Sequence, residues 1–375
     1  VKMAADYVLW FSEEARRVCG DTIPSPWNDR RLMVINQPVG VCAAITPWNF
    51  PSSMVARKVA PAVAAGCTVV LKPADLTPHS ALALGELAMR AGLPPGVFNI
   101  VIGDAATIGS ELCSNPDVAK LSFTGSTRVG RILMQQVAPT VKRLSLELGG
   151  NAPFIVFEDA DLDAAIAGLM ISKFRNAGQT CVCANRIFVQ DSIYEEFSAR
   201  VKEAVAKLKV GPGDQEGVEQ GPLINERAVV KVEEHIADAV EKGACILLGG
   251  KRHALGGTYF EPTVLGEVSR TTKVFGEETF GPVAPLFRFK TEGEVIALAN
   301  DTEYGLASYF YTRDVARAYR VLEQLKAGMV GVNSGLITTE VAPFGGVKHS
   351  GLGREGGNLG MEEFLDVKYV CVGGL

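Results

Sequence analysis

The stretch Val41–Leu71, VCAAITPWNFPSSMVARKVAPAVAAGCTVVL, decides the fold. It opens with a short apolar run, Val41–Thr46, and closes with a second one, Thr68–Leu71. Between them, Ser52–Ala65 has the length and residue types of an amphipathic helix, and Gly66 stands where a helix C-terminus favours a left-handed backbone. Two apolar strands joined by one helix form a βαβ unit, which predicts parallel strand pairing.

Strand-like and helix-like segments alternate along the rest of the chain. Up to Gly150, the pattern predicts three more strands at 97–102, 120–124 and 143–148, with helices at 78–91, 105–113 and 126–137. Beyond Gly150, it predicts strands at 154–157, 186–190, 307–311 and 329–333, with helices at 162–174, 193–208, 228–242 and 315–325. We therefore expect an α/β fold with parallel sheets covered on both faces and a domain boundary near Gly149–Gly150.

Two β-rich segments, Arg31–Asn36 and Glu363–Val372, fit neither series. A strand near each end of the chain, outside the main domains, indicates a small added sheet. Such a sheet can join copies of a chain, so we expect a homodimer or a homotetramer.

Composition narrows the classes of function. The 375 residues carry a net charge of −5 with scattered basic residues, which argues against a nucleic-acid surface. The longest apolar stretch, Val59–Leu71, is shorter than the roughly 18 residues of a membrane span. The eight cysteines are widely spaced and indicate reduced thiols. The four histidines show no ligand spacing, so no metal site is expected.

Cys181 is the candidate nucleophile. It lies in the polar loop FRNAGQTCVC (174–183), directly after a predicted helix, whereas the other cysteines occupy apolar runs. An accessible thiolate makes cysteine a nucleophile. On loop context alone, a buried structural thiol is an equal alternative, and zinc binding would require a second Cys/His pair.

Glu147 is the candidate general base. It stands in the apolar strand segment LELGG (146–150), where a carboxylate is costly unless it is used or paired. Burial raises the proton affinity of a carboxylate and suits it to proton transfer near neutral pH. The alternative is a salt bridge to a core arginine.

Asn49, in the Pro-bracketed loop TPWNFP (46–51), offers a fixed amide N–H donor of the kind that stabilises an oxyanion. Taken alone, it is equally well an ordinary turn residue.

Gly125 and Ser126 lie in FTGSTRVG (123–130), a strand followed by a helix whose start can present backbone N–H groups to a phosphate. The G-x-G-x-x-G pattern at Gly351–Gly356 is not a strand-to-helix turn, so we reject it as a dinucleotide fingerprint.

Taken together, these segments resemble the NAD(P)-dependent aldehyde dehydrogenase superfamily over essentially the whole chain. The matching motifs are PWNFP (47–51), KPAD (72–75), FTGST (123–127), LELGG (146–150), FRNAGQTC (174–181), EETFGP (277–282) and PFGGVKHSGLGRE (343–355). The resemblance implies a cofactor-binding domain (1–18 and 38–149), a catalytic domain (150–357) and an oligomerisation element (19–37 and 358–375). It also implies that part of the cofactor domain precedes Val1, so the activity of these 375 residues alone is an open question.

In this superfamily, the cysteine matching Cys181 attacks the aldehyde, and the asparagine matching Asn49 holds the oxyanion. The glutamate matching Glu147 then activates the water that hydrolyses the thioester. The implied cofactor is NAD, with NADP as the alternative. Its implied contacts are Thr46, Pro47, Trp48, Lys72, Asp75, Gly125, Ser126, Leu148, Glu278 and Phe280.

Within the superfamily, the chain is most similar to the succinate-semialdehyde dehydrogenases, through FRNAGQTCVCAN (174–185), NAPFIVFEDADLD (151–163) and GPLINE (221–226). A substrate with a distal carboxylate needs a cation in its pocket. The resemblance assigns this role to Arg57 and Arg175, assisted by Thr338, where that subfamily has serine. A structural role for either arginine is the alternative.

We therefore predict oxidation of succinate semialdehyde to succinate. Glutarate semialdehyde is a competing substrate, because one methylene is worth only about 1–3 kcal/mol. Two other hypotheses are that the protein is a dehydrogenase for another aldehyde, or that it is a non-catalytic relative of the superfamily. The expected location is the cytoplasm, with the mitochondrion as the alternative. The resemblance also implies a reversible Cys181–Cys183 disulfide under oxidants, with Cys183 as an inert pocket residue as the equal alternative. It further implies a preference for NAD, because members of the family that favour NAD often have an acidic residue at the position of Asp75.

Overall fold

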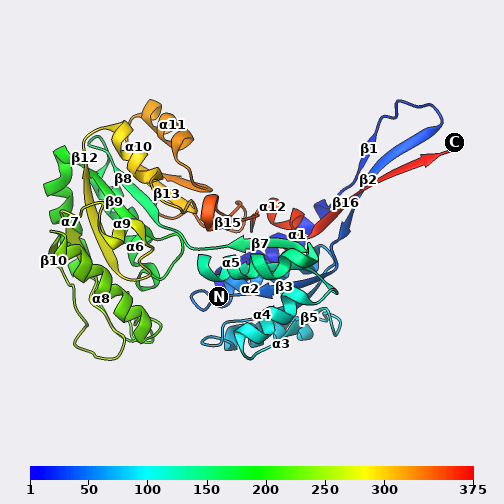
Figure 1. The fold of residues 1–375 in the computed structure, drawn as a ribbon, viewed down its shortest axis with the longest axis horizontal. Coiled ribbons are helices and arrows are strands. Elements are labelled where there is room, and N and C mark those ends of the chain that lie inside the picture. The colour runs from blue at the N-terminus through cyan, green and yellow to red at the C-terminus, as the bar shows by residue number, and fades with distance from the viewer. The chain divides into compact units, whose positions relative to one another are not determined.

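The computed structural model describes residues 1–375, which form two units. The first unit comprises residues 1–148, 338–345 and 351–375, and the second comprises residues 149–337 and 346–350. Each unit has its own sheet and its own helices (Figure 1). Residues 338–345 and 351–357, which we expected in the catalytic domain, group with the first unit instead, where Gly351 and Leu352 pair with strand residues Glu147 and Leu146.

The first unit is built on a six-stranded sheet in the order β15-β7-β6-β3-β4-β5. The strands are β3 (Val41–Ile45), β4 (Thr68–Lys72), β5 (Phe98–Ile100), β6 (Val118–Thr124), β7 (Arg143–Glu147) and β15 (Gly351–Leu352). All neighbours are parallel except β15 and β7. The chain winds outward from β3 to β5 and then returns to β6 on the other side of β3. A switch of direction of this kind opens a crevice at the carboxyl ends of the two central strands.

Helices cover both faces of this sheet. They are α1 (Lys2–Glu14), α2 (Ser53–Ala64), α3 (His79–Arg90), α4 (Ala105–Ser114), α5 (Thr127–Val137) and α12 (Leu359–Glu362), with short 3₁₀ turns at Ala15–Arg17 and Ala138–Thr140. Cys42 and Ala44 of β3 join the apolar cluster of α1 and α2, whereas Ala43 joins that of α4 and α5. Gly66, the predicted helix-ending glycine, adopts a positive φ of 91°, and Gly92, which follows α3, adopts a φ of 86°.

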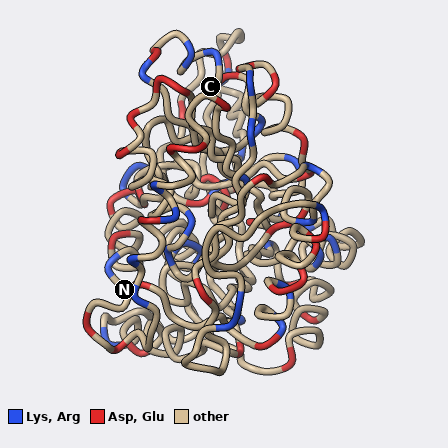
Figure 2. The backbone as a smooth tube through the Cα atoms, turned by 90° about the vertical axis from the view of Figure 1, so that its left-hand side faces the viewer, with Lys and Arg blue, Asp and Glu red and all other residues tan.

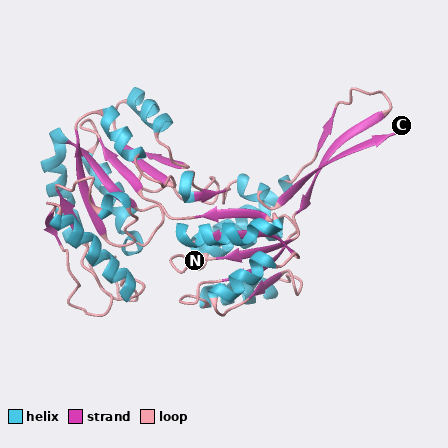
Figure 3. Ribbon diagram, in the orientation of Figure 1, coloured by secondary structure: helices cyan, strands magenta, loops and turns pink.

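A separate three-stranded antiparallel sheet is formed by β1 (Asp21–Ile23), β2 (Arg30–Pro38) and β16 (Leu365–Gly373). The predicted small added sheet is therefore present, and the two β-rich segments that fitted neither main sheet pair with each other in it. These strands project as a ribbon from the first unit (Figure 3). Apolar side chains, including Ile35, Val367 and Tyr369, are exposed along it.

The second unit is built on a seven-stranded sheet in the order β10-β11-β12-β9-β8-β13-β14. The strands are β8 (Ala152–Val156), β9 (Ala184–Gln190), β10 (Cys245–Leu248), β11 (Thr263–Gly266), β12 (Val283–Phe289), β13 (Ala307–Tyr311) and β14 (Met329–Val332). All neighbours are parallel except β10 and β11. Alternate residues of β8 supply the two faces, because Ile155 joins one apolar cluster and Phe154 the other.

The helices of the second unit are α6 (Leu162–Phe174), α7 (Tyr194–Ala206), α8 (Glu226–Glu241), α9 (Lys273–Gly276), α10 (Glu292–Asn300) and α11 (Val315–Gln324). Short 3₁₀ turns occur at η3 (Arg175–Gly178), η4 (Asp191–Ile193) and η5 (Lys348–Ser350). Strands β10 to β12 and helices α9 and α10 are not among the predicted elements. Helix α10 nevertheless starts with a capping box, in which Thr291 accepts from the Glu294 amide and Glu294 accepts from the Thr291 amide.

Charged residues of both signs are interspersed along the backbone (Figure 2). None of the helices combines the length and apolar character needed to cross a bilayer.

Candidate active site

Four parallel strands of the first unit bring the predicted cofactor and base residues to one edge of the sheet. Asn49 follows β3, Lys72 ends β4, Gly125 follows β6 and Glu147 ends β7. Backbone hydrogen bonds tie neighbouring strand ends together, from Thr46 N–H to the Lys72 carbonyl (3.1 Å) and from Gly125 N–H to the Glu147 carbonyl (3.0 Å). Because this edge contains the switch point between β3 and β6, it is where an α/β sheet binds ligands.

Glu147 is 2 % exposed, and neither of its carboxylate oxygens has a hydrogen-bond partner. Burial raises the pKa of Glu147 well above its ordinary value, and the nearby negative charge of Glu355 raises it further. The alternative expectation, a salt bridge to a core arginine, does not describe this carboxylate. A buried acid with a raised pKa and vacant acceptor sites is suited to taking a proton from water.

Glu355 is the centre of a buried ionic cluster beside Glu147. It forms an ion pair with Lys58, whose ammonium also donates to Ser122 Oγ at 3.0 Å. Arg57 lies on the other side, 3.6 Å from Glu355 Oε2. These contacts link helix α2, strand β6 and the segment after β15.

Arg57, a predicted substrate-binding residue, is 2 % exposed. Its guanidinium lies 4.1 Å from the ring centroid of Phe344 and 5.1 Å from that of Tyr7. Glu355 and the two aromatic faces thus already stabilise its charge.

Lys72 is also buried, and its ammonium donates to the Pro73 carbonyl (3.1 Å) and to Asp75 Oδ1 (2.5 Å). The Asp75 side chain is about half exposed to solvent. The lysine and aspartate predicted to contact the adenosine ribose therefore form one ion pair.

The start of α5 fits a phosphate group. Ser126 is the N-cap and accepts from the Val129 amide at 3.3 Å. Thr124, two residues earlier, has a buried hydroxyl without a hydrogen-bond partner. A Cβ at Gly125 would lie 2.4 Å from the Phe123 ring, so only glycine fits beside that ring, and Gly125 itself is half-buried. Leu148, which follows β7, packs against Gly130 of α5. A Cβ at Gly130 would lie 2.5 Å from the Leu148 side chain.

The loop carrying Thr46, Pro47, Trp48 and Asn49 connects β3 to α2. The Thr77 hydroxyl donates to the Trp48 carbonyl at 3.4 Å and anchors the loop to the segment before α3. The amide oxygen of Asn49 is enclosed by protein atoms. Thr338 is half-buried in the first unit, next to Thr339, whose carbonyl accepts from the Tyr7 hydroxyl.

In the second unit, Cys181 precedes β9 and thus lies at the amino edge of its sheet. The loop before it is unusually bent, with φ of 54° at both Asn176 and Ala177 and 74° at Gly178. Gln179 fixes this shape, because its side-chain amide donates to the Asn176 carbonyl (3.2 Å) and its carbonyl accepts from the Ile224 amide (2.9 Å). Cys181 is half-buried and Arg175 begins the same loop.

Cys183 is buried, and its thiol donates to the Lys173 carbonyl at 3.6 Å. Burial raises the pKa of this thiol. The expectation that the other cysteines are buried in apolar runs is wrong for Cys19, Cys245 and Cys371, which are exposed. Cys245 begins the outermost strand β10, and Cys371 lies on the open ribbon strand β16, so apolar neighbours in sequence do not enclose them. Exposure alone therefore does not single out Cys181.

Glu278 and Phe280 lie in the loop before β12, also at the amino edge of the second sheet. The Gly150 amide donates to Glu278 Oε1 at 3.0 Å. Burial raises the pKa of Glu278 to about 7. Gly150 itself touches the nucleophile loop, because a Cβ there would lie 2.4 Å from the Cys181 carbonyl oxygen.

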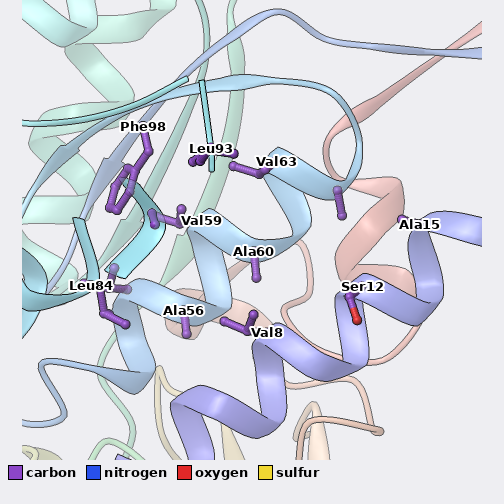
Figure 4. Close-up of a pocket in the computed structure, with 13 residues that line it drawn as sticks. Val8, Ser12, Ala15, Ala56, Val59, Ala60, Val63, Leu84, Leu93 and Phe98 are labelled. Carbon is purple, nitrogen blue, oxygen red and sulfur yellow. The ribbon is translucent and has the colours of Figure 1, made fainter. Parts of the chain in front are cut away.

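An apolar cavity of about 350 Å³ lies elsewhere in the first unit, between α1, α2 and α3 (Figure 4). Val8, Val59, Leu84 and Phe98 line it, and Ser12 is its single polar side chain. With no ionisable group, this cavity offers no catalytic chemistry.

Sequence reasoning missed several polar residues of these regions. Lys58 and Glu355 form an ion pair although they are 297 residues apart in sequence, and neither segment contains a pattern that predicts this contact. Thr124 could have been suspected from its position at a strand end. His235, buried in α8 beside the Glu278 loop, was considered only as a metal ligand.

The sequence matches the Aldehyde dehydrogenase family over residues 1–370, and the chain belongs to that family. Members of the family oxidise aldehydes with NAD(P).

Three relatives illustrate its position in the family. This chain is 64% identical to glutarate-semialdehyde dehydrogenase of Pseudomonas aeruginosa, over 100% of this chain and 78% of the relative. It is 62% identical to the NADP(+) succinate-semialdehyde dehydrogenase of Escherichia coli, over 100% of this chain and 77% of the relative. It is 64% identical to 3-sulfolactaldehyde dehydrogenase of Pseudomonas putida, over 98% and 76%.

Among solved structures, succinate-semialdehyde dehydrogenase from Burkholderia pseudomallei superposes with a TM-score of 0.98 at 62% identity, covering 99% of this chain and 77% of that one. The predicted fold class, an aldehyde dehydrogenase-like α/β fold, is thereby confirmed.

Proposed function

We propose that this protein oxidises succinate semialdehyde to succinate through a thioester on Cys181, which Glu147-activated water then hydrolyses. The observation that carries the proposal is the state of Glu147. Its carboxylate is buried, has a raised pKa and accepts no hydrogen bond, so its acceptor capacity is available to a water molecule.

Cys181 supplies the nucleophile. Its thiolate forms a bond to the aldehyde carbon, and the carbonyl electron pair moves to oxygen. The Asn49 side-chain amide and the backbone N–H of Cys181 donate to that oxygen. The left-handed residues before Cys181 support this role, because strained backbone of this kind persists where it positions a functional group.

The cofactor residues fit a nicotinamide dinucleotide. The buried Thr124 hydroxyl without a partner, the half-buried Gly125 backbone and the exposed N-cap residue Ser126 are suited to a phosphate at the start of α5. Lys72 and Asp75 would hold the adenosine ribose, and Glu278 and Phe280 the nicotinamide half. A bound dinucleotide supplies the hydride acceptor that aldehyde oxidation requires.

Hydrolysis follows oxidation. Glu147 takes a proton from water, the water oxygen forms a bond to the acyl carbon, and the bond from carbon to Cys181 sulfur breaks. Succinate leaves and the thiolate is restored.

An anionic group at the far end of the substrate agrees with the names of the relatives, which act on succinate semialdehyde, glutarate semialdehyde and 3-sulfolactaldehyde. For this chain, we assign the cation that receives this group to Arg175. Arg57 contributes less in our proposal, because Glu355 and two aromatic rings already stabilise it. Thr338 would add a hydroxyl donor.

We further propose that copies of the chain associate through the β1–β2–β16 ribbon into a dimer or tetramer. The exposed apolar side chains on this ribbon would become buried in such an assembly. The eight free cysteines are consistent with work in the reducing cytoplasm.

A turnover assay tests the proposed function. Succinate semialdehyde, glutarate semialdehyde and butanal are each oxidised with NAD and with NADP, and kcat/KM is compared. We expect the two anionic aldehydes to exceed butanal, with succinate semialdehyde first. Equal values for butanal and succinate semialdehyde would contradict recognition of the carboxylate.

A further inference from the structure

Side chains of helix α8 form hydrogen bonds and an ion pair with the loop that carries Glu278 and Phe280. His235 Nδ1 lies 2.8 Å from Thr279 Oγ1, and His235 Nε2 lies 3.3 Å from Glu277 Oε2. Lys231, one turn earlier on the same helix, donates to Glu277 Oε2 at 2.9 Å. His235 and Thr279 are each 1 % exposed, so the contact between them is deeply buried, whereas the Glu277 side chain is 50 % exposed.

The side chains of the loop point to opposite sides in turn. Glu277 and Thr279 face α8, whereas Glu278, between them, accepts from the Gly150 amide on the other side. The orientation of Glu278 therefore depends on how α8 holds its two neighbours.

The same loop is packed tightly against the nucleophile segment. A Cβ at Gly281 would lie 2.4 Å from Val232 of α8, and a Cβ at Gly178 would lie 2.0 Å from the Gly281 carbonyl oxygen. The loop is thus held between α8 and the turn that precedes Cys181, and its backbone has little freedom to move.

The chemistry of the contact fixes the roles of the imidazole. The Glu277 carboxylate accepts hydrogen bonds only, so Nε2 of a neutral imidazole carries the proton and donates to it. Nδ1 then accepts from the Thr279 hydroxyl. The resulting two-point contact is directional, which an apolar side chain of the same size could not reproduce.

We propose that His235 is a positioning residue for cofactor binding, which orients Glu278 and Phe280 by holding Glu277 and Thr279. This inference rests on the proposed function, because it takes Glu278 and Phe280 as contacts of the nicotinamide half. In this proposal, His235 acts through Glu277 and Thr279 and makes no contact of its own with cofactor or substrate.

The test compares four variants of the full chain. His235→Phe keeps a ring and removes both hydrogen bonds, and Thr279→Val removes one hydroxyl with little change of shape. Thr279→Ser restores the hydroxyl. Tyr194→Phe is the matched control, because it removes a buried hydroxyl that accepts from the Glu267 amide at 2.8 Å, away from the loop.

The readouts are the dissociation constants of NAD and NADP from quenching of protein fluorescence, the KM of cofactor and aldehyde, and the midpoint of thermal unfolding. For His235→Phe and Thr279→Val we expect a dissociation constant and a cofactor KM raised about five- to tenfold, as for loss of a buried hydrogen bond. The aldehyde KM should change less than about twofold. Thr279→Ser should bind like the unmodified chain, and Tyr194→Phe should lower only the unfolding midpoint.

A purely structural role for His235 predicts the opposite pattern. If His235→Phe and Thr279→Val lower the unfolding midpoint as Tyr194→Phe does, and leave the cofactor dissociation constant unchanged, the proposal is overturned. If His235→Phe does not fold, Thr279→Val decides the question by itself. If the unmodified chain binds neither NAD nor NADP, the proposed function and this inference are both overturned. If the unmodified chain binds cofactor and the variants bind it equally well, only the inference about His235 is overturned.

Discussion

The protonation state of Glu147 controls the last chemical step of the proposed reaction. Its pKa is raised, first by burial and then by the charge of Glu355. Only the carboxylate form accepts a proton from water, so we expect the deacylation rate to rise with pH from the ordinary range of carboxyl groups up to the raised pKa. The raised pKa also means that folding favours protonated Glu147 relative to the unfolded chain. This contribution to the stability of the fold is present at low pH and is lost as pH rises through the raised pKa.

Single-turnover hydrolysis of the acyl-enzyme between about pH 5 and about pH 9 measures this dependence. Glu363→Gln is a matched control, because Glu363 is a carboxylate of the same unit paired with Lys120 at 3.1 Å. The control should keep the pH profile in place. A deacylation rate that is flat over this range would be incompatible with Glu147 as the base.

Arg175 should read the distal carboxylate of the substrate. We expect Arg175→Gln to lower kcat/KM for succinate semialdehyde by about 1.5–3 kcal/mol, the value of a charge-assisted hydrogen bond, and to affect butanal much less. Arg200→Gln is the control, since Arg200 forms exposed ion pairs with Asp163 and Glu196 on α6 and α7. Equal losses with both aldehydes would show that Arg175 supports the loop instead.

At the level of elements, the loop between α6 and β9 combines the nucleophile with a second thiol. We predict that peroxide oxidises Cys181 first, because burial raises the pKa of Cys183 and keeps it as a thiol. Cys183 would then displace hydroxide from the oxidised sulfur, giving a disulfide and water. Peroxide inactivation should therefore be reversed by dithiothreitol, and reversal should be lost in Cys183→Ala. If reductant restores nothing in the unmodified chain, the switch does not exist.

We propose that the connection between β4 and α3 sets the choice of dinucleotide. Asp75 accepts from Lys72, and its carboxylate would repel a ribose 2′-phosphate. We expect NAD to be preferred, and Asp75→Ser to improve NADP use by releasing Lys72 toward the phosphate. Ratios of kcat/KM for the two cofactors check this. The Escherichia coli relative carries NADP(+) in its name, so a native preference for NADP is the concrete outcome that would refute our interpretation of Asp75.

Elements with a strong local signal could be predicted from sequence. Strand β3 and helix α2 lie within one residue of the predicted bounds, because an uninterrupted apolar run and a helix-ending glycine mark them. The short strands β10 and β11, of four residues each, lack such a signal. Thr291 and Glu294 have the spacing of a capping box at the start of helix α10, although this helix is not among the predicted elements.

Site residues divide in the same way. Lys72 and Gly125 directly follow the strands predicted at 68–71 and 120–124, Asn49 follows the strand predicted at 41–46, and the structure brings all three to one edge of the sheet. The position of Cys181 at the amino edge of its sheet differs from that rule, and its polar loop and its family motif identified it instead. The contacts of Glu355 and His235 join segments far apart in sequence, which depend on the whole fold.

At the scale of the whole molecule, the two units supply different chemistry. The first unit contains Glu147, Asn49 and the start of α5, and the second contains Cys181, Arg175 and Glu278. Because the chain belongs to the aldehyde dehydrogenase family, we propose that these residues take part in one reaction.

The most direct test of that reaction is mass spectrometry of Glu147→Gln mixed with succinate semialdehyde and cofactor. Oxidation precedes hydrolysis, so this variant should give a burst of reduced cofactor approaching one per chain, followed by slow turnover. A succinyl group should then be found on the peptide that contains Cys181, and Cys181→Ala should show neither burst nor adduct. Steady oxidation by Cys181→Ala, or a burst in Glu147→Gln with no acyl group on Cys181, would contradict the thioester mechanism.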